Sequence, residues 1–365
     1  MLARLRLLTA GESHGPALVG ILEGMPAGVP VDRAALRADM LRRRQAAGRS
    51  ARMGIEGDDI EVLGGVRHGR TLGSPIGFVI RNVEFERWRT TMSPFCDDVD
   101  VDERPVAVPR PGHADFAGAK KLGIDDARDV LERASARETA ARTAAGAFCR
   151  QLLRAVGIEV TSQVLSIGGA SDEASIQQAI DTARATGDTL GGVFEVRATR
   201  LPIGLGHYAH FDRRLSARLG EALMSIHAVR SFAIGAGAEP SAVSTSSGRV
   251  FHDPIASLAG ARPSNNAGGV EGGMSNGMPV VVRAFVKPLA TVAGGLASVA
   301  FASGEPAHGH VERSDTTAVP AAAVVGEAMV CLVLADALME KFGGDSLAQL
   351  RGHMAASAAH VDERP

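Results

Sequence analysis

Two histidines stand in settings that suit proton transfer at neutral pH. The first, His14, lies in the run Gly11-Glu12-Ser13-His14-Gly15, where the flanking glycine leaves its ring open to a bound molecule. Imidazole exchanges protons near neutral pH, so an accessible histidine can act as a general acid. A turn histidine without a catalytic task is the alternative, and residue type alone gives the two interpretations similar weight.

The same run, residues 11–15, matches the Gly-x-Ser-x-Gly nucleophile elbow of serine hydrolases. That elbow follows strands of a parallel sheet and opens a helix. Here the run follows the first expected strand and leads into an apolar stretch, Ala17 to Leu22. The context disfavours a serine hydrolase built on Ser13, which stays as an alternative.

The second histidine is His113, in the run Arg110-Pro111-Gly112-His113-Ala114-Asp115. The proline and glycine fix this loop, and Asp115 could orient the ring as carboxylates orient catalytic histidines. His14, His113 and Asp115 could also ligate a metal, but no HExxH motif or close histidine pair supports this. We therefore predict no metal site.

Cationic side chains gather in several places. Five arginines fall within eleven residues, namely Arg42, Arg43, Arg44, Arg49 and Arg52. Guanidinium groups bind phosphate and carboxylate bidentately, so this cluster is a candidate anion site. The alternative is a solvated helix end, where cations favour the helix dipole. If the cluster binds an anion, we expect its arginines to be removable with little change in melting temperature. Further candidates beside turns or a helix start are Arg133 to Ser135, Lys287 to Thr291, and Arg313 to Asp315.

These side chains need a scaffold of mixed strands and helices. Hydrophobic periodicity predicts strands at 4–7, 17–22, 60–63, 66–67, 76–80, 158–168, 193–199 and 280–286. Cap and breaker residues predict helices at 33–45, 135–157, 213–227 and 320–341, a surface loop at 96–111, and a frayed tail from 352. Because strands and helices do not alternate regularly, we expect an α+β fold with mostly antiparallel strands.

Composition excludes several protein classes. The 365 residues carry 39 Lys+Arg and 41 Asp+Glu, a net charge of −2, and only 4% are aromatic, which argues against a general nucleic-acid binder. Three widely spaced cysteines argue against a disulfide framework and favour a reducing cytoplasm. Arg4 and Arg6 interrupt any secretion signal, and Glu327 and Asp336 interrupt the most apolar stretch, so we expect neither export nor a membrane span. No phosphate-binding P-loop or dinucleotide-binding glycine motif is found.

Taken together, eight motifs resemble the chorismate synthase family. They occur in the family's order between residues 10 and about 345: Ala10 to Gly15, Arg42 to Arg44, Arg110 to Asp115, Arg133 to Thr139, Met224 to Ala228, Ser264 to Gly269, Lys287-Pro288, and Arg313 to Asp315. One of these motifs would be weak support, but eight in register are specific.

The resemblance implies a fold, an assembly and a reaction. The fold would be a single domain, residues 1–365, in which helices lie between mostly antiparallel sheets as a β-α-β sandwich, assembled as a homotetramer in the cytoplasm. The reaction would be the 1,4-elimination of phosphate from 5-enolpyruvylshikimate 3-phosphate to give chorismate, with reduced FMN and no net redox change. An external source would reduce the flavin, and no nucleic acid or membrane would take part.

The resemblance also implies roles for individual residues. His14 would be the acid beside the leaving phosphate, His113 would supply a proton near the flavin, and Asp315 would help to remove the C6 hydrogen. Arg43 and Arg49 would bind the substrate anion or a nicotinamide dinucleotide. The flavin positions would be Arg133, Ala134, Ser135, His227, Ala228, Gly272, Lys287, Pro288, Leu289, Ala290, Thr291 and Arg313.

The chain departs from the family's usual pattern at a few positions. Many members have glycines in place of Val130 to Glu132, a serine in place of Ala134, and a histidine in place of Ser314. These departures touch the expected flavin contacts and leave His14, His113 and Asp315 intact. A flavin or phosphometabolite binding protein without turnover is the third interpretation.

Overall fold

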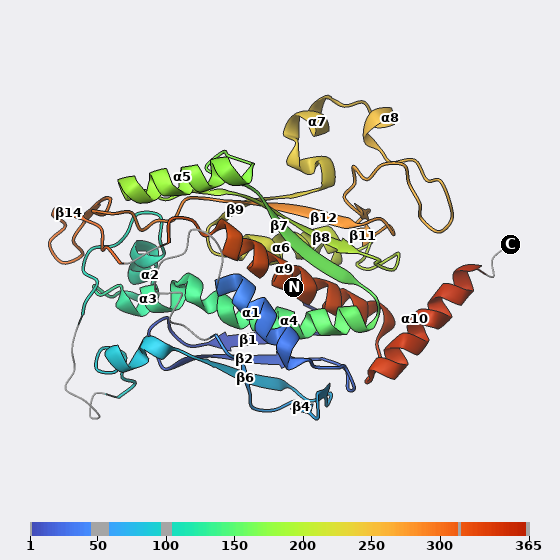
Figure 1. Ribbon diagram of the computed structural model, residues 1–365, viewed down its shortest axis with the longest axis horizontal. Helices are drawn as coiled ribbons and strands as arrows, with labels where there is room; N and C mark the ends of the chain where they lie inside the picture. Colours follow the sequence, from blue (N-terminus) through green and yellow to red (C-terminus); the bar gives the residue numbers. More distant parts are fainter. Residues whose placement is uncertain (1, 45–57, 96–103, 313–314, 363–365) are drawn as a thin grey trace.

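The computed structural model describes residues 2–44, 58–95, 104–312 and 315–362. Two four-stranded sheets lie on either side of a layer of helices (Figure 1). Every pairing in these two sheets is antiparallel. The expected α+β class is therefore confirmed, whereas the assignment of the whole chain to one domain stays a prediction.

The first sheet has the strand order β1-β2-β6-β3. Its strands are β1 (Arg6–Ala10), β2 (Ala17–Glu23), β6 (Ile76–Arg81) and β3 (Glu61–Val62). Leu18, Leu22 and Phe78 are buried on the face toward the helices. Gly20 of β2 leaves room for the Phe78 ring, because a Cβ there would lie 2.1 Å from Cζ of that ring. This sheet carries the loop that presents His14.

The second sheet has the strand order β7-β8-β12-β9. Its strands are β7 (Glu159–Ile167), β8 (Gly192–Thr199), β12 (Val280–Val286) and β9 (Val229–Ile234). Along β12 every second residue is buried, as expected of a strand with one face on the core. The strand predicted at 280–286 is confirmed residue for residue, and its end leads directly to Lys287.

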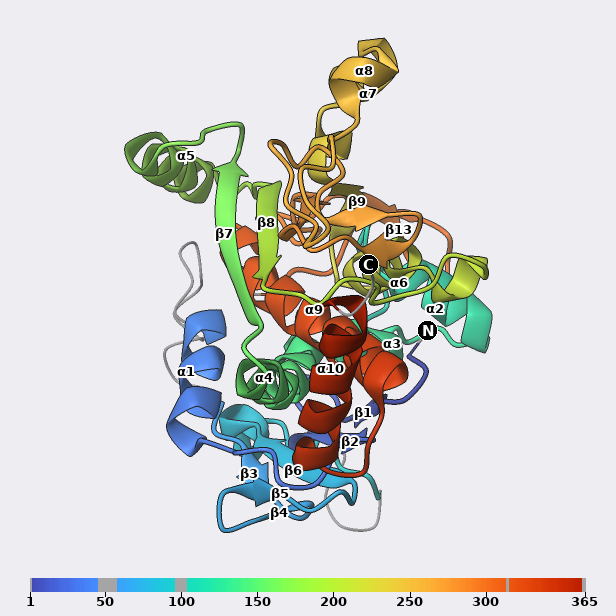
Figure 2. The same ribbon diagram turned by 90° about the vertical axis from the view of Figure 1, so that its right-hand side faces the viewer.

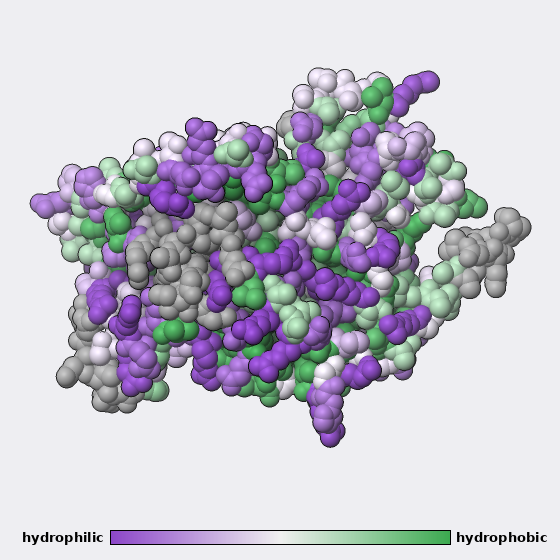
Figure 3. Space-filling view, in the orientation of Figure 1, coloured by the Kyte–Doolittle hydropathy of each residue, from purple (hydrophilic) through white to green (hydrophobic). Residues whose placement is uncertain are grey.

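Three long helices fill the space between the sheets: α1 (Arg33–Arg44), α4 (Thr139–Ala155) and α9 (Val319–Phe342). In the described part of the chain, α9 alone has the length and hydropathy of a membrane span, and its most apolar 18-residue window is wholly buried in the fold. Helix α9 is therefore a core helix. The face of the molecule in Figure 3 is mostly hydrophilic, with apolar side chains in smaller patches.

Buried charges on α9 are matched by partners from distant segments. Glu327 accepts two hydrogen bonds from Arg42, at 2.9 and 2.7 Å, and also pairs with Arg150. Burial opposes ionisation of this carboxyl, but the two guanidinium groups lower its pKa. Asp336 accepts the backbone N–H groups of residues 3–5 at 2.7–3.0 Å, which attaches the start of the chain to α9.

The remaining elements surround this core. The further helices are α2 (Asp115–Leu122), α3 (Arg128–Ala134), α5 (Glu173–Thr186), α6 (Leu215–Met224), α7 (Pro240–Thr245), α8 (Gly248–Phe251) and α10 (Leu347–Asp362). Short 3₁₀ helices are η2 (Val83–Arg87), η4 (Ala136–Glu138), η5 (Phe211–Arg213) and η6 (Gly235–Ala238). Two-stranded pairs are β4 (Val66–Arg67) with β5 (Arg70–Thr71), β10 (Val270–Glu271) with β11 (Met274–Ser275), and β13 (Ala297–Val299) with β14 (Pro306–His308). Figures 1 and 2 show α7 and α8 projecting beyond the second sheet.

Three expectations about helix bounds were wrong. The helix expected from residue 135 begins later, as α4 at Thr139: Ser135 Oγ accepts from the N–H of Arg137 at 3.3 Å and opens η4, while Glu138 bonds to Thr9 and Arg142. The tail expected to fray from 352 is helical as α10 through Asp362. Helix α6 also begins later than expected, at Leu215.

Candidate active site

A cavity of about 540 Å³ lies where both sheets and the central helices meet. Its polar wall comes from segments far apart in sequence, namely Ser13, His14, Arg43, Arg110, His113, Ser135, Arg137, Thr139, His227, Lys287, Thr291, Glu312 and Asp315. Its apolar wall includes Leu131, Ile226, Leu289 and alanines of α9. Many convergent polar groups over an apolar floor are typical of a small-molecule site.

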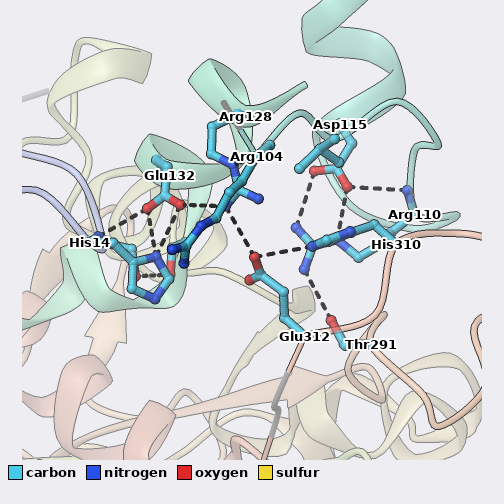
Figure 4. Close-up of polar contacts among 12 residues, drawn as sticks. His14, Arg104, Arg110, Asp115, Arg128, Glu132, Thr291, His310 and Glu312 are labelled. Atoms are coloured by element: carbon cyan, nitrogen blue, oxygen red, sulfur yellow. Dashed lines mark hydrogen bonds and ion pairs between the residues drawn. The ribbon is translucent and has the colours of Figure 1, made fainter. Parts of the chain in front are cut away.

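His14 is held firmly at one end of the cavity (Figure 4). Its Nδ1 lies 3.0 and 2.9 Å from the two carboxylate oxygens of Glu132, and its backbone N–H donates to Glu132 Oε2 at 2.9 Å. The ring stacks on Trp88 with centroids 4.0 Å apart. The ring of His14 is therefore fixed by several contacts, and its catalytic role stays a prediction.

A charged network extends outward from Glu132. Arg128 donates to Glu132 at 3.0 Å and to Glu312 at 3.4 Å, and His310 Nε2 lies 3.3 Å from Glu312 (Figure 4). Burial opposes ionisation of Glu312, but the His310 hydrogen bond and the charge of Arg110 lower its pKa to about 2. Glu312 is therefore an anion at neutral pH.

A second cavity of about 330 Å³ also borders His14. It is lined by His14, Trp88, Arg104, Pro105, Arg128, His310, Val311 and Glu312. His14 and Glu312 thus form part of the wall of both cavities.

His113 is held by the loop motif as expected. Its Nδ1 makes a short contact with the carboxylate of Asp115, which is fully buried. Arg110 Nε donates to Asp115 at 2.8 Å, and Arg110 Nη1 donates to Thr291 at 3.2 Å. Burial opposes ionisation of Asp115, but the hydrogen bonds with His113 and Arg110 hold its pKa well below the usual range. The orienting role predicted for Asp115 has the geometry it requires.

Arg43 is buried, with 2% of its surface exposed. It donates to Asp58 Oδ2 at 3.2 Å and to Thr139 Oγ1 at 3.0 Å, while Arg137 contacts the other oxygen of Asp58. The solvated-helix-end interpretation is therefore wrong for Arg43. Arg49 and Arg52 lie outside the described residues.

The wall expected to hold a flavin contains a buried ring nitrogen, Nδ1 of His227, that has no hydrogen-bond partner among the described groups. Burial lowers the pKa of His227 to about 4, so the ring is neutral at pH 7. Nearby, Lys287 Nζ donates to the carbonyl of Gly112 at 3.0 Å, and Leu289 and Ala290 supply apolar surface. FMN is a large heteroaromatic ring system that carries a phosphate. The neutral imidazole of His227 can donate to it or accept from it, Lys287 offers a positive charge, and Leu289 and Ala290 offer apolar surface, so these residues fit FMN.

The structure brings most of the predicted site residues together. Those that line the large cavity are His14, Arg43, His113, Ala134, Ser135, His227, Ala228, Lys287, Leu289, Ala290, Thr291 and Asp315. Arg133 instead holds the end of β1, since it donates to the carbonyls of Thr9 and Gly11 at 3.1 and 3.0 Å. Pro288 and Gly272 do not line this cavity, and Gly272 lies in the turn between β10 and β11. Arg313 is outside the described residues.

Sequence reasoning missed several residues of the site. Arg137, Glu132, Trp88 and Glu312 carry much of its charge and shape, yet none was singled out as a ligand. The spacing of Arg133 and Arg137 along one short segment was the available signal for Arg137. Trp88 gave no signal, because its approach to His14 depends on the fold.

The serine hydrolase alternative does not fit this geometry. Ser13 follows an antiparallel strand and precedes β2 rather than a helix. Its hydroxyl accepts from Ser135 Oγ at 3.2 Å, while the ring of His14 bonds to Glu132. In the parts of the chain that the structure describes, no three His, Cys, Asp or Glu side chains are grouped so that they could hold a metal.

A family model described as chorismate synthase matches residues 5–339. The chain belongs to the chorismate synthase family. The chorismate synthase of Thermobifida fusca (strain YX) is 49% identical, with 96% of this chain and 98% of that protein covered. That of Saccharopolyspora erythraea is 47% identical, with 99% and 98% covered. A crystal structure of chorismate synthase superposes with a TM-score of 0.79 at 36% identity over all of both chains.

Membership of the chorismate synthase family makes the chain an enzyme of the lyase class. The large cavity is where the family's motifs converge in this structure: residues 10–15, 42–44, 110–115, 133–139 and 287–288 all contribute to it.

Proposed function

We propose that this protein converts 5-enolpyruvylshikimate 3-phosphate to chorismate and phosphate by 1,4-elimination, with reduced FMN and no net redox change. The observation that carries the proposal is one cavity that combines two carboxylate-held histidines, an aspartate and several cations, namely His14, His113, Asp315, Arg43, Arg110, Arg137 and Lys287. Proton donors and anion ligands in one enclosed space are what the elimination of a phosphate needs.

The cations suit the charge of the substrate, which carries a phosphate and two carboxylates. Arg43 and Arg137 are both buried and both contact Asp58, so their guanidinium groups are fixed before a ligand binds. Fixed, desolvated cations bind anions more strongly than exposed ones. We assign Arg43 to the substrate rather than to a nicotinamide dinucleotide, and Arg49 by analogy.

FMN would be held by the wall that includes His227, Lys287, Leu289 and Thr291, with its phosphate or ring edge meeting the polar groups. When bound in reduced form, the flavin supplies electron density that weakens the bond to the leaving phosphate. The alanines at 228, 290 and 318 leave room for a flat ring system.

Each histidine would transfer a proton through the ring nitrogen that does not contact a carboxylate. Glu132 and Asp115 each engage Nδ1, so Nε2 of His14 and Nε2 of His113 are the atoms available for transfer. His14 would protonate the leaving phosphate, and His113 would hold a proton at the flavin end of the cavity. Asp315 would assist removal of the C6 hydrogen.

The test is an anaerobic assay that measures phosphate and chorismate after FMN is reduced with dithionite. We expect turnover with reduced FMN and little or none with NADPH and oxidised FMN. His14→Ala, His113→Ala and Asp315→Asn should each lower turnover by about 10²–10⁴, the usual effect of losing a positioned proton-transfer group. Near-normal turnover in one of these variants would remove the role assigned to that residue.

The two alternatives give different results in simple assays. A serine hydrolase would be labelled at Ser13 by a fluorophosphonate, and we expect no labelling. A binding protein without turnover would bind FMN and release no phosphate.

Assembly, reductant and location complete the proposal. On the basis of family membership we propose a homotetramer in the cytoplasm that receives reduced flavin from an external source, without a nucleic-acid or membrane partner. Light scattering of the full chain tests the tetramer, and a molar mass of one or two subunits would contradict it.

A further inference from the structure

The carboxylate of Glu132 is the centre of the contacts around His14. It is 1% exposed and lies on α3, while His14 lies in the loop after β1. One of its oxygens accepts the backbone N–H of His14 at 2.9 Å, and both lie within 3.0 Å of Nδ1 of the same residue. The backbone carbonyl of Glu132 also accepts the N–H of Ser13 at 3.0 Å. Glu132 therefore holds both the backbone and the ring of the loop.

These contacts decide which ring nitrogen carries a proton. A carboxylate held by the Arg128 guanidinium at 3.0 Å accepts hydrogen bonds and has none to donate. A neutral imidazole has one N–H and one bare nitrogen, and Nδ1 beside two acceptor oxygens must be the N–H. Nε2 is then the bare nitrogen, which can take up a proton and deliver it.

The plane of the ring is held separately. Trp88 stacks on His14 at 4.0 Å with an angle of 23° between the planes. Arg104 and Arg128 lie over the indole at 5.1 and 5.3 Å, and such cation–π contacts hold the indole in place. Glu132 fixes the rotation of the imidazole within the plane that Trp88 sets.

We propose that Glu132 is the positioning residue for His14: it fixes the Nδ1–H tautomer and thereby makes Nε2 the proton-transfer atom. Only the effect on turnover rests on the proposed function; the tautomer follows from the contacts alone. The other charged groups near His14 are Arg128 of the same helix, Arg104, and the pair Glu312 and His310. The two oxygens of Glu132 lie 3.0 and 2.9 Å from Nδ1, so Glu132 is the group that selects the tautomer.

The test is a long-range ¹H–¹⁵N NMR spectrum of the full-length protein labelled with ¹⁵N-histidine. It is recorded at pH 9 without substrate or flavin, with His14 assigned by comparison with His14→Asn. Protonated and bare ring nitrogens have well-separated shifts, so the spectrum reports the tautomer directly. We expect Nδ1 of wild-type His14 to be the protonated nitrogen. An Nε2–H tautomer in the wild type would overturn the proposal, whether or not any variant folds.

The matched variants are Glu132→Gln and Glu138→Gln. Glutamine at 132 keeps the size of the side chain but adds an NH₂ donor that can face Nδ1, so we expect at least half of His14 to change to the Nε2–H tautomer. Glu138 is a buried glutamate of the neighbouring η4 that bonds to Thr9 and Arg142, so Glu138→Gln should leave the His14 signals unchanged. An unchanged tautomer in a folded Glu132→Gln protein would overturn the proposal.

Turnover separates this inference from the proposed function. With dithionite-reduced FMN, we expect Glu132→Gln to lower kcat about 10- to 100-fold and to change KM less than about threefold, because the ring remains but a neutral glutamine no longer stabilises the imidazolium from which Nε2 delivers its proton. A change of tautomer without a fall in kcat would leave Glu132 as the residue that positions His14. That result would overturn the proton-donor role of His14 instead.

Discussion

Arg42 and Arg43 are neighbours at the end of α1, yet their surroundings differ completely. Arg42 reaches across the helix layer to Glu327 of α9, whereas Arg43 points into the large cavity and pairs with Asp58. Consecutive helix positions are turned by about 100°, so neighbouring side chains cannot share one environment. One run of like residues therefore serves two separate tasks.

Replacing Arg43 by alanine should weaken both the fold and ligand binding. It leaves Asp58 with one fewer cation and removes a donor from Thr139, and breaking a buried ion pair costs about 3–5 kcal/mol of unfolding free energy. Loss of a desolvated anion ligand should also raise the Kd for 5-enolpyruvylshikimate 3-phosphate more than tenfold. Urea unfolding and substrate titration measure the two effects. The expectation from sequence that melting temperature would hardly change is thus replaced.

The matched control is Arg37→Ala on the same helix. Arg37 pairs with Asp59 at 3.5 Å, but both side chains are about two-thirds exposed, at 67% and 68%. Exposed pairs contribute less than about 1 kcal/mol, so this variant should keep near-normal stability and substrate binding. Equal losses in the two variants would contradict the assignment of Arg43 to the site.

At the residue scale, sequence reasoning succeeded where a local motif supplies its own geometry. His113 and Asp115 are two residues apart in one loop, and they meet as predicted. It failed where partners come from elsewhere in the chain: Glu132 reaches His14 across 118 positions, and no spacing rule indicates such a pair. Arg133, assigned to the flavin by resemblance, donates to the carbonyl of Thr9 in β1, a contact that the sequence did not indicate, and its role toward the flavin stays a prediction.

The two central helices α4 and α9 approach each other closely at one point. A Cβ on Gly146 of α4 would lie 2.4 Å from Cβ and 2.5 Å from Cα of Ala328 on α9. These atoms of Ala328 belong to the helix backbone and to a methyl group attached directly to it, so they cannot move aside as the end of a flexible side chain can. The separation of these helices, and with it the roof of the cavity on α9, depends on the missing side chain at 146.

Gly146→Ala should therefore destabilise the protein. Added volume in a packed core costs about 1–3 kcal/mol, which exceeds the gain of up to ~1 kcal/mol expected from replacing glycine within a helix. The comparison variant is Gly352→Ala in α10, where a Cβ would meet nothing within 4 Å. That variant should be neutral or slightly more stable in urea unfolding. A stabilised Gly146→Ala protein would show that α4 and α9 can separate without cost.

A helix or strand could be predicted from the sequence where its own residues carry a clear hydrophobic pattern. The alternating strand at 280–286 and the long apolar helix α9 carry their own periodicity, and both were predicted. Helix α5 was missed, although Asp172 caps it by accepting from the N–H of Ser175 at 3.0 Å and Gly187 ends it. Its first turns are polar and largely exposed, so no apolar stripe indicated a helix. Strand β9 was missed because it follows a helix end without a break in composition.

Across the whole molecule, the near-neutral net charge conceals many buried ionic groups whose partners lie on other elements. The pKa values of Asp115, Glu312 and Glu327 are lowered by hydrogen bonds and nearby cations, in spite of burial. Unfolding in acid releases these carboxyls to take up protons, so the free energy of unfolding must fall as the pH falls below about 4.5. The sequence predicted the α+β class of the fold that brings these carboxyl groups and their cationic partners together. It did not predict which carboxyl would pair with which cation.

His227 gives a separate dependence on pH in a milder range. Burial lowers its pKa to about 4, with help from the charge of Arg142 and against the charge of Glu138. An unfolded histidine takes up a proton below about pH 6.5, whereas the folded one does so only near pH 4. The unfolded state therefore binds more protons between these values, and the stability contributed by neutral His227 is complete above pH 6.5 and lost as the pH falls toward 4.

His227→Asn should remove this part of the profile. Asparagine does not titrate, so the difference in unfolding free energy between wild type and variant should change by about 2–3 kcal/mol from pH 7.5 to pH 4.5, in the direction that disfavours the wild type in acid. Slopes due to the carboxyl groups are common to both proteins and cancel in this difference. Urea unfolding at one protein concentration measures this difference in unfolding free energy.

The control is His68→Asn, at an exposed histidine with φ of 49°, a conformation that asparagine tolerates. His68→Asn should keep the wild-type slope, and an equally steep slope in His227→Asn would show that His227 is not neutral in the folded protein.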